Sequence, residues 1–393
     1  MKILFLPFLK VSTGHHVVAE ALIRSLEKRI HNIDCKMIDF FSYADKLLEK
    51  AFRVTYLKWI DHSPETFEWL YRNFVYPSGS IKKHFDWYER KFLDKMKNLI
   101  KIEQPDLIVC TQAFPSFLIS RLRHYGVNTP IVINVYTDFF INSLWGIHGI
   151  DYHFVPDYSI KKQLENNYNI HPNRIFITGI PVDDYFHTTV KTKTTPSKPY
   201  HILISGGNSG LGEIQNLITN LPKDNDYYFS VLCGHNKKLY REIVALNQHN
   251  IKPLSYISSR ETMNALYDRA DAIITKAGGV TLSEALWKRV PIFVHASLPG
   301  QEDINKQFLL ERKLINILDL NISVSEQLNS FFGNSEKQKE LRQRIDEYIN
   351  HFECLAWQKI MELAIKTVLK SHHCSQLVHF SENNLSKHNN LRM

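Results

Sequence analysis

The fold is decided by one stretch of the chain, Thr275-Lys276-Ala277-Gly278-Gly279-Val280-Thr281-Leu282-Ser283-Glu284-Ala285-Leu286. Residues 271–274, just before it, are a short apolar run typical of a buried strand, and residues 282–288 predict a helix. The glycine pair at this turn lets backbone N–H groups approach a ligand, and the start of a helix carries partial positive charge that favours phosphate. We therefore expect the turn to bind a diphosphate.

The carboxylate of Glu284 lies one turn into the expected helix, where it can reach two vicinal hydroxyls such as those of a ribose. Thr281-x-x-Glu284 is equally the pattern of a capping box, which would satisfy N–H groups at the helix start. The chain downstream favours the ligand, because residues 291–294 predict the next strand and residues 298–305 follow it with amide and carboxylate side chains. Two polar loops at the same edge of an open α/β sheet indicate a nucleotide-sugar site.

The stretch from Thr275 to Leu286, followed by Pro299-Gly300-Gln301-Glu302-Asp303-Ile304-Asn305, resembles the donor-sugar motif of glycosyltransferase family 28. Within that family it is similar to the monogalactosyldiacylglycerol synthases and the bacterial processive diacylglycerol glucosyltransferases. The resemblance implies an α/β protein with the GT-B fold, in which two Rossmann-like domains with parallel sheets face a central cleft. It also implies inverting chemistry without a metal or cofactor, with a UDP-hexose as co-substrate.

The composition is typical of a soluble globular protein, with 44% hydrophobic and 22% charged residues, and 393 residues suffice for two domains. The formal net charge of +8 indicates an anionic partner, either nucleic acid or anionic lipid. The five cysteines include no CxxC pair, so neither a zinc site nor a disulfide framework is expected. No apolar run reaches membrane-spanning length, and residues 3–9 are too short for a signal sequence. We expect a cytoplasmic protein that lies peripherally on the cytoplasmic face of the cell membrane.

A histidine beside a glycine follows the first predicted strand, residues 2–9, and precedes a predicted helix, residues 17–28. A histidine at such a turn can face a cleft and act as a general base on a hydroxyl, although a loop histidine taken singly is more often exposed and inert. Gly14-His15-x-x-x-Ala19-Glu20-Ala21 is similar to the acceptor-side motif of the family, which implies that His15 is the catalytic base. His16 has no such support.

Residues 52–92 contain twelve aromatic side chains and end in a mixture of aromatic and basic residues. This composition favours contact with an anionic membrane, where rings lie at headgroup level and cations pair with lipid. The alternative is an ordinary helical insertion whose aromatic face is buried and whose basic face is solvated. Nucleic acid is disfavoured, because no nucleic-acid-binding motif occurs in the chain. The expected membrane residues are Trp59, Trp69, Lys82, Lys83, Trp87, Arg90 and Lys91.

Residues 130–138 predict another strand, and the motif Thr137-Asp138-Phe139 begins at its end. With Trp145 and Tyr152-His153-Phe154-Val155 further on, this segment again resembles the lipid glycosyltransferases. Those enzymes usually carry a histidine where this chain has Asn142. Asp138 is a candidate to orient His15 or contact the acceptor, and it is equally suited to cap the turn that follows.

The domain limits follow from composition and from the resemblance. We expect a first domain over residues 1–186, a linker over 187–199, a donor domain over 200–352, a helix over about 353–370 that returns to the first domain, and a disordered tail over 371–393. The Gly-rich turn at 206–212 is by itself a weak phosphate signal, and Gly234 ends a strand where a nucleotide can approach. Together with the resemblance, these patterns give the expected donor contacts Gly14, Asn208, Ser209, Gly234, Ile257, Gly278, Gly279, Thr281, Glu284, Gln301, Glu302 and Asn305.

Within that set, the resemblance implies that Glu284 binds the ribose and that Gln301, Glu302 and Asn305 read the sugar hydroxyls. The function we expect is transfer of a hexose from a UDP-sugar to the hydroxyl of diacylglycerol or of a glycosyldiacylglycerol. Two alternatives stay open: a transferase of the same fold acting on a soluble or polyprenyl-linked acceptor, and a UDP-sugar 2-epimerase. A non-catalytic lipid-binding protein with a decayed active site is a third, more remote alternative.

Overall fold

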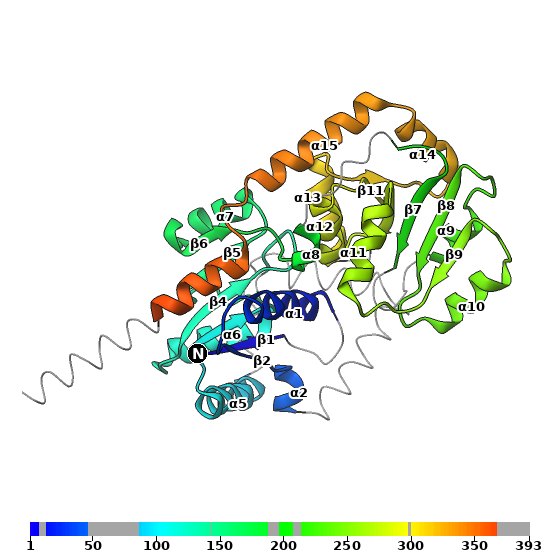
Figure 1. Ribbon diagram of the computed structural model, residues 1–393. Coiled ribbons are helices and arrows are strands. Elements are labelled where there is room, and N and C mark those ends of the chain that lie inside the picture. The colour runs from blue at the N-terminus through cyan, green and yellow to red at the C-terminus, as the bar shows by residue number, and fades with distance from the viewer. Residues whose placement is uncertain are drawn as a thin grey trace, which may run out of the picture.

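The computed structural model describes residues 1–7, 13–45, 86–142, 144–187, 196–206, 214–297 and 300–367, and for residues 86–89 only the backbone. The described residues form two parallel sheets of six strands each, with helices on both faces (Figure 1). This is the α/β architecture with two Rossmann-like domains that the sequence predicts. Among the described helices, none is both long and apolar enough to span a bilayer.

The first sheet has the strand order β2-β1-β3-β4-β5-β6. Residues 3–6 and 107–110 of its central strands are apolar and buried, as expected of a parallel sheet covered by helices. The strands are β1 (Lys2–Leu6), β2 (Asp34–Met37), β3 (Leu107–Cys110), β4 (Ile131–Val135), β5 (Tyr152–Val155) and β6 (Ile175–Ile177). The helices are α1 (Gly14–Glu27), α2 (Phe40–Ala44), α5 (Asp86–Glu103), α6 (Ala113–His124), α7 (Tyr158–Tyr168) and α8 (Asp184–His187).

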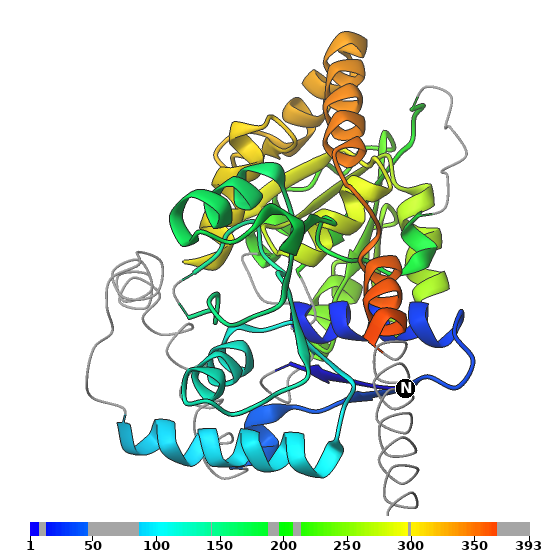
Figure 2. The ribbon, with the colours of Figure 1, turned by 90° about the vertical axis from the view of Figure 1, so that its left-hand side faces the viewer.

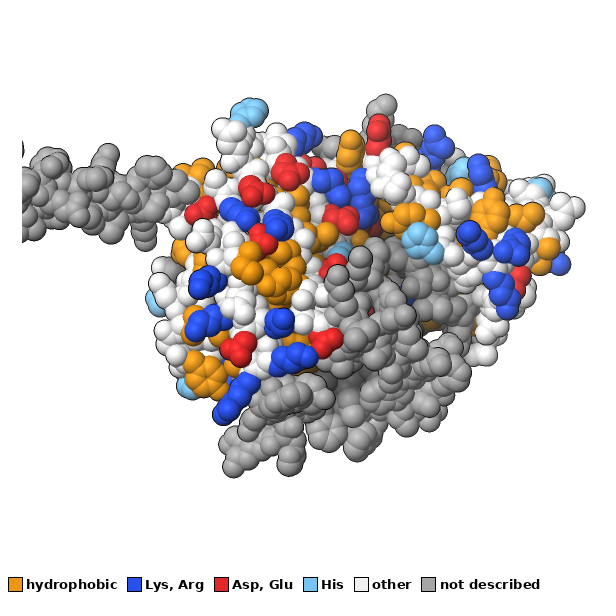
Figure 3. All heavy atoms as spheres, turned by 90° about the horizontal axis from the view of Figure 1, so that it is seen from below, with side chains coloured by type: hydrophobic (Ala, Val, Ile, Leu, Met, Phe, Trp, Pro, Cys, Tyr) orange, Lys and Arg blue, Asp and Glu red, His pale blue; other side chains and the backbone are white. Residues whose placement is uncertain are grey.

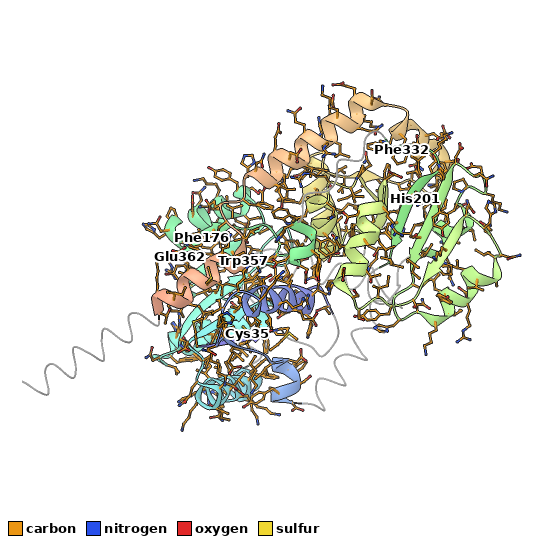
Figure 4. All side chains as sticks on the ribbon, viewed as in Figure 1. Cys35, Phe176, His201, Phe332, Trp357 and Glu362 are labelled. Carbon is orange, nitrogen blue, oxygen red and sulfur yellow. The ribbon has the colours of Figure 1, made fainter. Side chains whose placement is uncertain are left out.

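The second sheet has the order β12-β11-β10-β7-β8-β9. Its strands are β7 (Tyr200–Ser205), β8 (Tyr227–Leu232), β9 (Ile251–Leu254), β10 (Ala272–Lys276), β11 (Ile292–Ala296) and β12 (Asn316–Ile317). Its helices are α9 (Ile214–Thr219), α10 (Lys237–Ala245), α11 (Arg260–Arg269), α12 (Gly279–Trp287), α13 (Gln301–Glu311), α14 (Val324–Phe332) and α15 (Ser335–Asn350). Phe332 of α14 stacks on Tyr200, with ring centroids 4.1 Å apart, and so holds α14 against β7 (Figure 4).

Each sheet reverses its strand order at one point, and ligands of open α/β sheets generally bind beyond the carboxyl ends of the strands at such a point. In the first sheet this point lies between β1 and β3, and in the second between β10 and β7. The turn that carries His15 follows β1, and the turn that carries Gly278 follows β10. The topology therefore brings both expected loops to the ligand-binding positions of their sheets.

The end of the described chain lies against the first sheet, although it follows the second domain in sequence (Figure 2). The N–H of Glu353 donates to the carbonyl oxygen of Ile177 at 2.8 Å. The guanidinium carbon of Arg29, two residues beyond the end of α1, lies 3.9 Å from the centre of a Trp357 ring, and Lys359 Nζ lies 4.2 Å from the Phe176 ring (Figure 4). These contacts tie helical residues 356–367 to the first domain, while the domain limits themselves stay a prediction.

Candidate functional site

The N-terminal ends of α1 and α12 meet across the boundary between the two domains. A Cβ atom added to Gly14 would lie 3.1 Å from Val280 Cγ2, and one added to Gly279 would lie 2.4 Å from the carbonyl oxygen of Thr137. The glycine at 279 is thus required by the approach of the first domain, whereas we had expected the glycine pair to admit a ligand. Gly278 is more open, since the nearest described atom to such a Cβ is Glu302 Oε1 at 3.9 Å.

The imidazole of His15 is held by the ends of the two neighbouring strands β3 and β4. Its Nδ1 lies 2.9 Å from the carbonyl oxygen of Thr111 and 2.8 Å from Thr137 Oγ1. A carbonyl oxygen can only accept, so Nδ1 carries the hydrogen, and the lone pair is on Nε2. Burial lowers the pKa of His15 to about 4, although the hydrogen bond to Thr111 acts in the opposite direction. His15 is therefore a neutral, oriented imidazole near pH 7, as a general base must be.

Asp138 does not orient His15, because that role belongs to Thr111 and Thr137. Instead, Asn305 Nδ2 donates to Asp138 Oδ1 at 2.9 Å and to the carbonyl oxygen of Ala277 at 3.3 Å. The N–H of Phe139 donates to Asn305 Oδ1 at 2.9 Å. Burial raises the pKa of Asp138 to about 6, against the effect of the Asn305 hydrogen bond.

The amide of Asn305 is fully buried and bonded to both domains. This arrangement argues against the expected contact between Asn305 and a sugar hydroxyl, because its two N–H groups and its oxygen already have protein partners. Asn305 therefore links the two domains by hydrogen bonds. Its position in the polar loop after a predicted strand does not distinguish such a link from a contact with a ligand.

Glu284 lies inside α12 and is only 7% exposed. The hydroxyl of Tyr267 donates to Glu284 Oε2 at 3.1 Å, and Arg260 Nη1 lies 3.7 Å from Oε1. Burial raises the pKa of Glu284 to about 7, against the field of Arg260. Gly278 is the N-cap residue of α12, so Thr281 lies inside the helix and the capping-box alternative is wrong. Contact between Glu284 and a ribose stays a prediction.

The start of α13 closes the same edge of the second sheet. Lys276 Nζ, at the end of β10, lies 3.1 Å from Glu302 Oε1. Gln301 is the first residue of α13 and is half-buried. Lys276, Thr111 and Thr137 were not among the residues predicted for the site. Lys276 is the last residue of β10, and Thr111 and Thr137 follow the ends of β3 and β4, so their position at the carboxyl end of a strand was the available signal.

The nucleotide end of the expected site is less enclosed. Gly234, with φ of 56°, lies two residues beyond the end of β8 and lines a hollow of about 240 Å³ together with Ser255 and residues of α10. The next residues of this loop are Tyr256, which stacks on His235 at 4.1 Å, and the half-buried Ile257. Contacts from Gly234 and Ile257 to a nucleotide stay predictions.

Several expected site residues fall outside the description. Asn208 and Ser209 lie outside the described residues, as do Trp59, Trp69, Lys82 and Lys83, and Trp87 is described only by its backbone. In the part of α5 whose side chains are described, Phe92 packs inward. Its ring centroid lies 5.3 Å from that of Phe114 and 5.7 Å from that of Phe41. Arg90 and Lys91 are exposed. This end of the segment has the buried aromatic and solvated basic faces of an ordinary amphipathic helix. Seen from below, Lys and Arg side chains are spread over the described surface (Figure 3).

The motif with Trp145 forms a buried cluster around β4. The Trp145 ring lies 4.6 Å from the Tyr136 ring, and the Tyr136 hydroxyl bonds to His153 Nδ1 at 3.0 Å. Asn142 is buried and its side chain accepts from the N–H of Leu144 at 3.0 Å. The residues that resemble the lipid glycosyltransferases here therefore pack the loop after β4, and Asn142 stabilises its turn.

The described residues contain no group of three or more His, Cys, Asp or Glu side chains that could hold a metal ion. The expectation of metal-independent chemistry stays a prediction. The positive end of α12 begins at Gly279, and such a helix start favours the charge of a diphosphate.

Comparison with known proteins agrees with this geometry. Residues 15–182 match the family described as monogalactosyldiacylglycerol (MGDG) synthase, and residues 201–346 match the glycosyltransferase family 28 C-terminal domain. The chain is 39% identical over 371 residues to the uncharacterized glycosyltransferase YkoN of Bacillus subtilis (strain 168), covering 94% of this chain and 96% of that protein. It is 28% identical over 345 residues to a processive diacylglycerol beta-glucosyltransferase of Bacillus licheniformis, covering 84% of this chain and 87% of that protein.

Solved structures show the same fold at low identity. MurG of Acinetobacter baumannii superposes with a TM-score of 0.58 at 15% identity, covering 93% of this chain and all of that one. The UDP-N-acetylglucosamine 2-epimerase described as putative from Listeria monocytogenes also gives 0.58 at 15% identity, covering 94% and 97%. Transferases and epimerases thus share this architecture, and the fold alone does not choose between them.

Proposed function

Because the chain belongs to glycosyltransferase family 28, with a first domain of the monogalactosyldiacylglycerol synthase type, we propose that it transfers a hexose from a UDP-sugar to diacylglycerol or a glycosyldiacylglycerol. The observation that carries this proposal is His15. Its Nδ1 is bonded to the Thr111 carbonyl and its Nε2 holds the lone pair, at the end of α1 that meets the N-terminus of α12. A base and a diphosphate site on opposite domains are the two parts that glycosyl transfer needs.

The reaction follows from these two parts. Nε2 of His15 takes the proton of the acceptor hydroxyl while that oxygen forms a bond to the anomeric carbon. The bond from this carbon to the diphosphate breaks on the opposite side, and UDP leaves with the electron pair, so the configuration inverts. The first N–H groups of α12 stabilise the departing charge. The Thr111 carbonyl accepts from Nδ1 throughout and stabilises the imidazolium that forms.

The low pKa of His15 matters for the timing of proton transfer. The imidazole of His15 is neutral before the reaction. As the acceptor oxygen attacks, negative charge develops on the leaving diphosphate, and this charge raises the pKa of His15. In this proposal Glu284 binds the ribose of the donor, and Gln301 and Glu302 contact the hexose. The lipid acceptor is supported by relatives whose names state a diacylglycerol acceptor.

The test is UDP release from UDP-glucose, UDP-galactose and UDP-N-acetylglucosamine, with and without diacylglycerol in anionic liposomes. We expect release that requires diacylglycerol, falls by about 10²–10⁴-fold in His15→Ala and persists in His124→Ala. His124 is a matched control, because it is an exposed histidine of the same domain at the end of α6. UDP release at the same rate with and without diacylglycerol would refute diacylglycerol as the acceptor. Formation of an isomeric sugar without transfer would indicate an epimerase.

A further inference from the structure

The strand β11 carries an irregularity where it reaches the site. Thr275 of β10 pairs with Val294, but the next residue, Lys276, pairs with Ala296. His295 is therefore an extra residue, opposite the step from Thr275 to Lys276. Such bulges are uncommon in parallel pairs, and next to active sites they redirect a side chain.

The imidazole of His295 is buried and has unused hydrogen-bonding capacity. It is 8% exposed, and neither ring nitrogen has a partner within the part of the chain that the structure describes. Burial, with a smaller effect from the charge of Lys276, lowers the pKa of His295 to about 4. The ring is thus neutral near pH 7 and offers one donor and one acceptor. Buried polar groups nearly always have a hydrogen-bond partner, so a ligand is a candidate partner for this imidazole.

Two charged side chains, Lys276 and Glu302, lie between the bulge and the start of α12. Lys276, opposite the bulge, has its Nζ 3.1 Å from Glu302 Oε1. The same Glu302 oxygen lies 3.9 Å from the position of a Cβ on Gly278. A ligand whose diphosphate lies at Gly278 would extend its next group past Glu302 toward Lys276 and His295.

We propose that His295 forms a hydrogen bond with a hydroxyl of the donor hexose and so helps to select the sugar. This inference rests on the proposed function, since it assumes a UDP-hexose at α12. A hydroxyl both donates and accepts, which matches a neutral imidazole, whereas a phosphate only accepts and is better served by Lys276 and the helix N-terminus.

The experiment measures the Kd of UDP, UDP-glucose, UDP-galactose and UDP-xylose by titration calorimetry without acceptor. It compares wild type with His295→Phe, which removes both ring nitrogens, and with His295→Gln, which keeps a donor and an acceptor. We expect His295→Phe to weaken the preferred UDP-hexose about tenfold while the Kd of UDP stays within twofold, and His295→Gln to recover part of the loss. The matched control is His201→Gln, an exposed histidine at the opposite, amino end of β7 in the same domain (Figure 4).

The outcomes separate the two proposals. If wild type binds none of these nucleotides, the proposed function fails and this inference fails with it. If wild type binds a UDP-hexose and neither His295 variant changes its affinity relative to UDP, only this inference is overturned. A drop in Tm with unchanged binding would show that His295 is structural, because removal of two unpartnered nitrogens should leave Tm equal or higher. If His295→Phe does not fold, the comparison of His295→Gln with His201→Gln tests the inference instead. We then expect His295→Gln to bind the UDP-hexose about two- to threefold more weakly than His201→Gln does.

Discussion

Replacement of Asn305 by alanine separates a joint between the domains from a sugar contact. The substitution removes one acceptor and two donor contacts, and it leaves the Phe139 N–H, the Asp138 carboxylate and the Ala277 carbonyl without this partner. Each buried group that loses its partner costs about 1–3 kcal/mol, and these costs are not additive. We expect Asn305→Ala to lower the free energy of unfolding by about 3–5 kcal/mol. Because the entropy of unfolding is about 2.1 cal/mol/K per residue, this loss corresponds to a fall in Tm of roughly 4–6 °C for a chain of 393 residues.

The loss should depend on pH, because Asp138 has a pKa of about 6 in the folded protein, raised by burial and held down by Asn305. Above pH 6 the carboxylate is charged and needs the amide donor, whereas at pH 5 it is largely protonated and needs it less. The difference in Tm between wild type and Asn305→Ala should therefore be larger at pH 7.5 than at pH 5, as measured by circular dichroism. The difference in Tm between the two proteins should change mainly around pH 6, where Asp138 titrates.

The matched control is Gln301→Ala, since Gln301 is an amide four residues earlier in the same helix and is only half-buried. We expect this variant to keep the wild-type Tm within about 1 °C, as surface substitutions usually do. If Asn305→Ala also keeps the wild-type Tm and instead weakens UDP-sugar binding, Asn305 is a sugar contact after all and the reasoning from its hydrogen bonds is refuted.

Three further predictions concern the same boundary. His15→Ala should lower kcat by about 10²–10⁴-fold with little change in the Kd of UDP, and an equal loss in both would point to a binding role. The folded pKa of His15, about 4, lies below its usual value of 6.5; its contribution to stability is therefore complete above pH 6.5 and is lost as pH falls from 6.5 toward 4. In the pH profile of kcat/KM, we expect the inflection due to His15 near pH 4. An inflection near pH 6.5 that disappears in His15→Ala would contradict the conclusion that burial lowers the pKa of His15. Gly279→Ala should destabilise the protein by about 1–3 kcal/mol, because its Cβ would lie 2.4 Å from a backbone oxygen of Thr137, whereas Gly278→Ala should not; equal Tm values for the two variants would refute the close approach.

Much of the architecture was predictable because it depends on local patterns. Apolar runs such as residues 271–274 and 291–294 predict buried parallel strands, and the glycine turn after 276 predicts a loop at a ligand edge. The strands and helices that the structure places there follow these patterns within a few residues. The sequence alone therefore determined the fold class and the strand ends at which the site would form.

The tertiary structure decided which side chains meet there. His15 is oriented by Thr137, which is 122 positions away, and Asp138 pairs with Asn305, which is 167 positions away. His295 is set apart by a change of register between two strands. Such pairings depend on how two sheets are docked and registered in space, whereas residue spacing reports only the period of one helix or strand. For this reason the sequence could determine that His15, Asp138 and Asn305 lie near the cleft, but only the folded chain determines which of them is placed to act on a ligand.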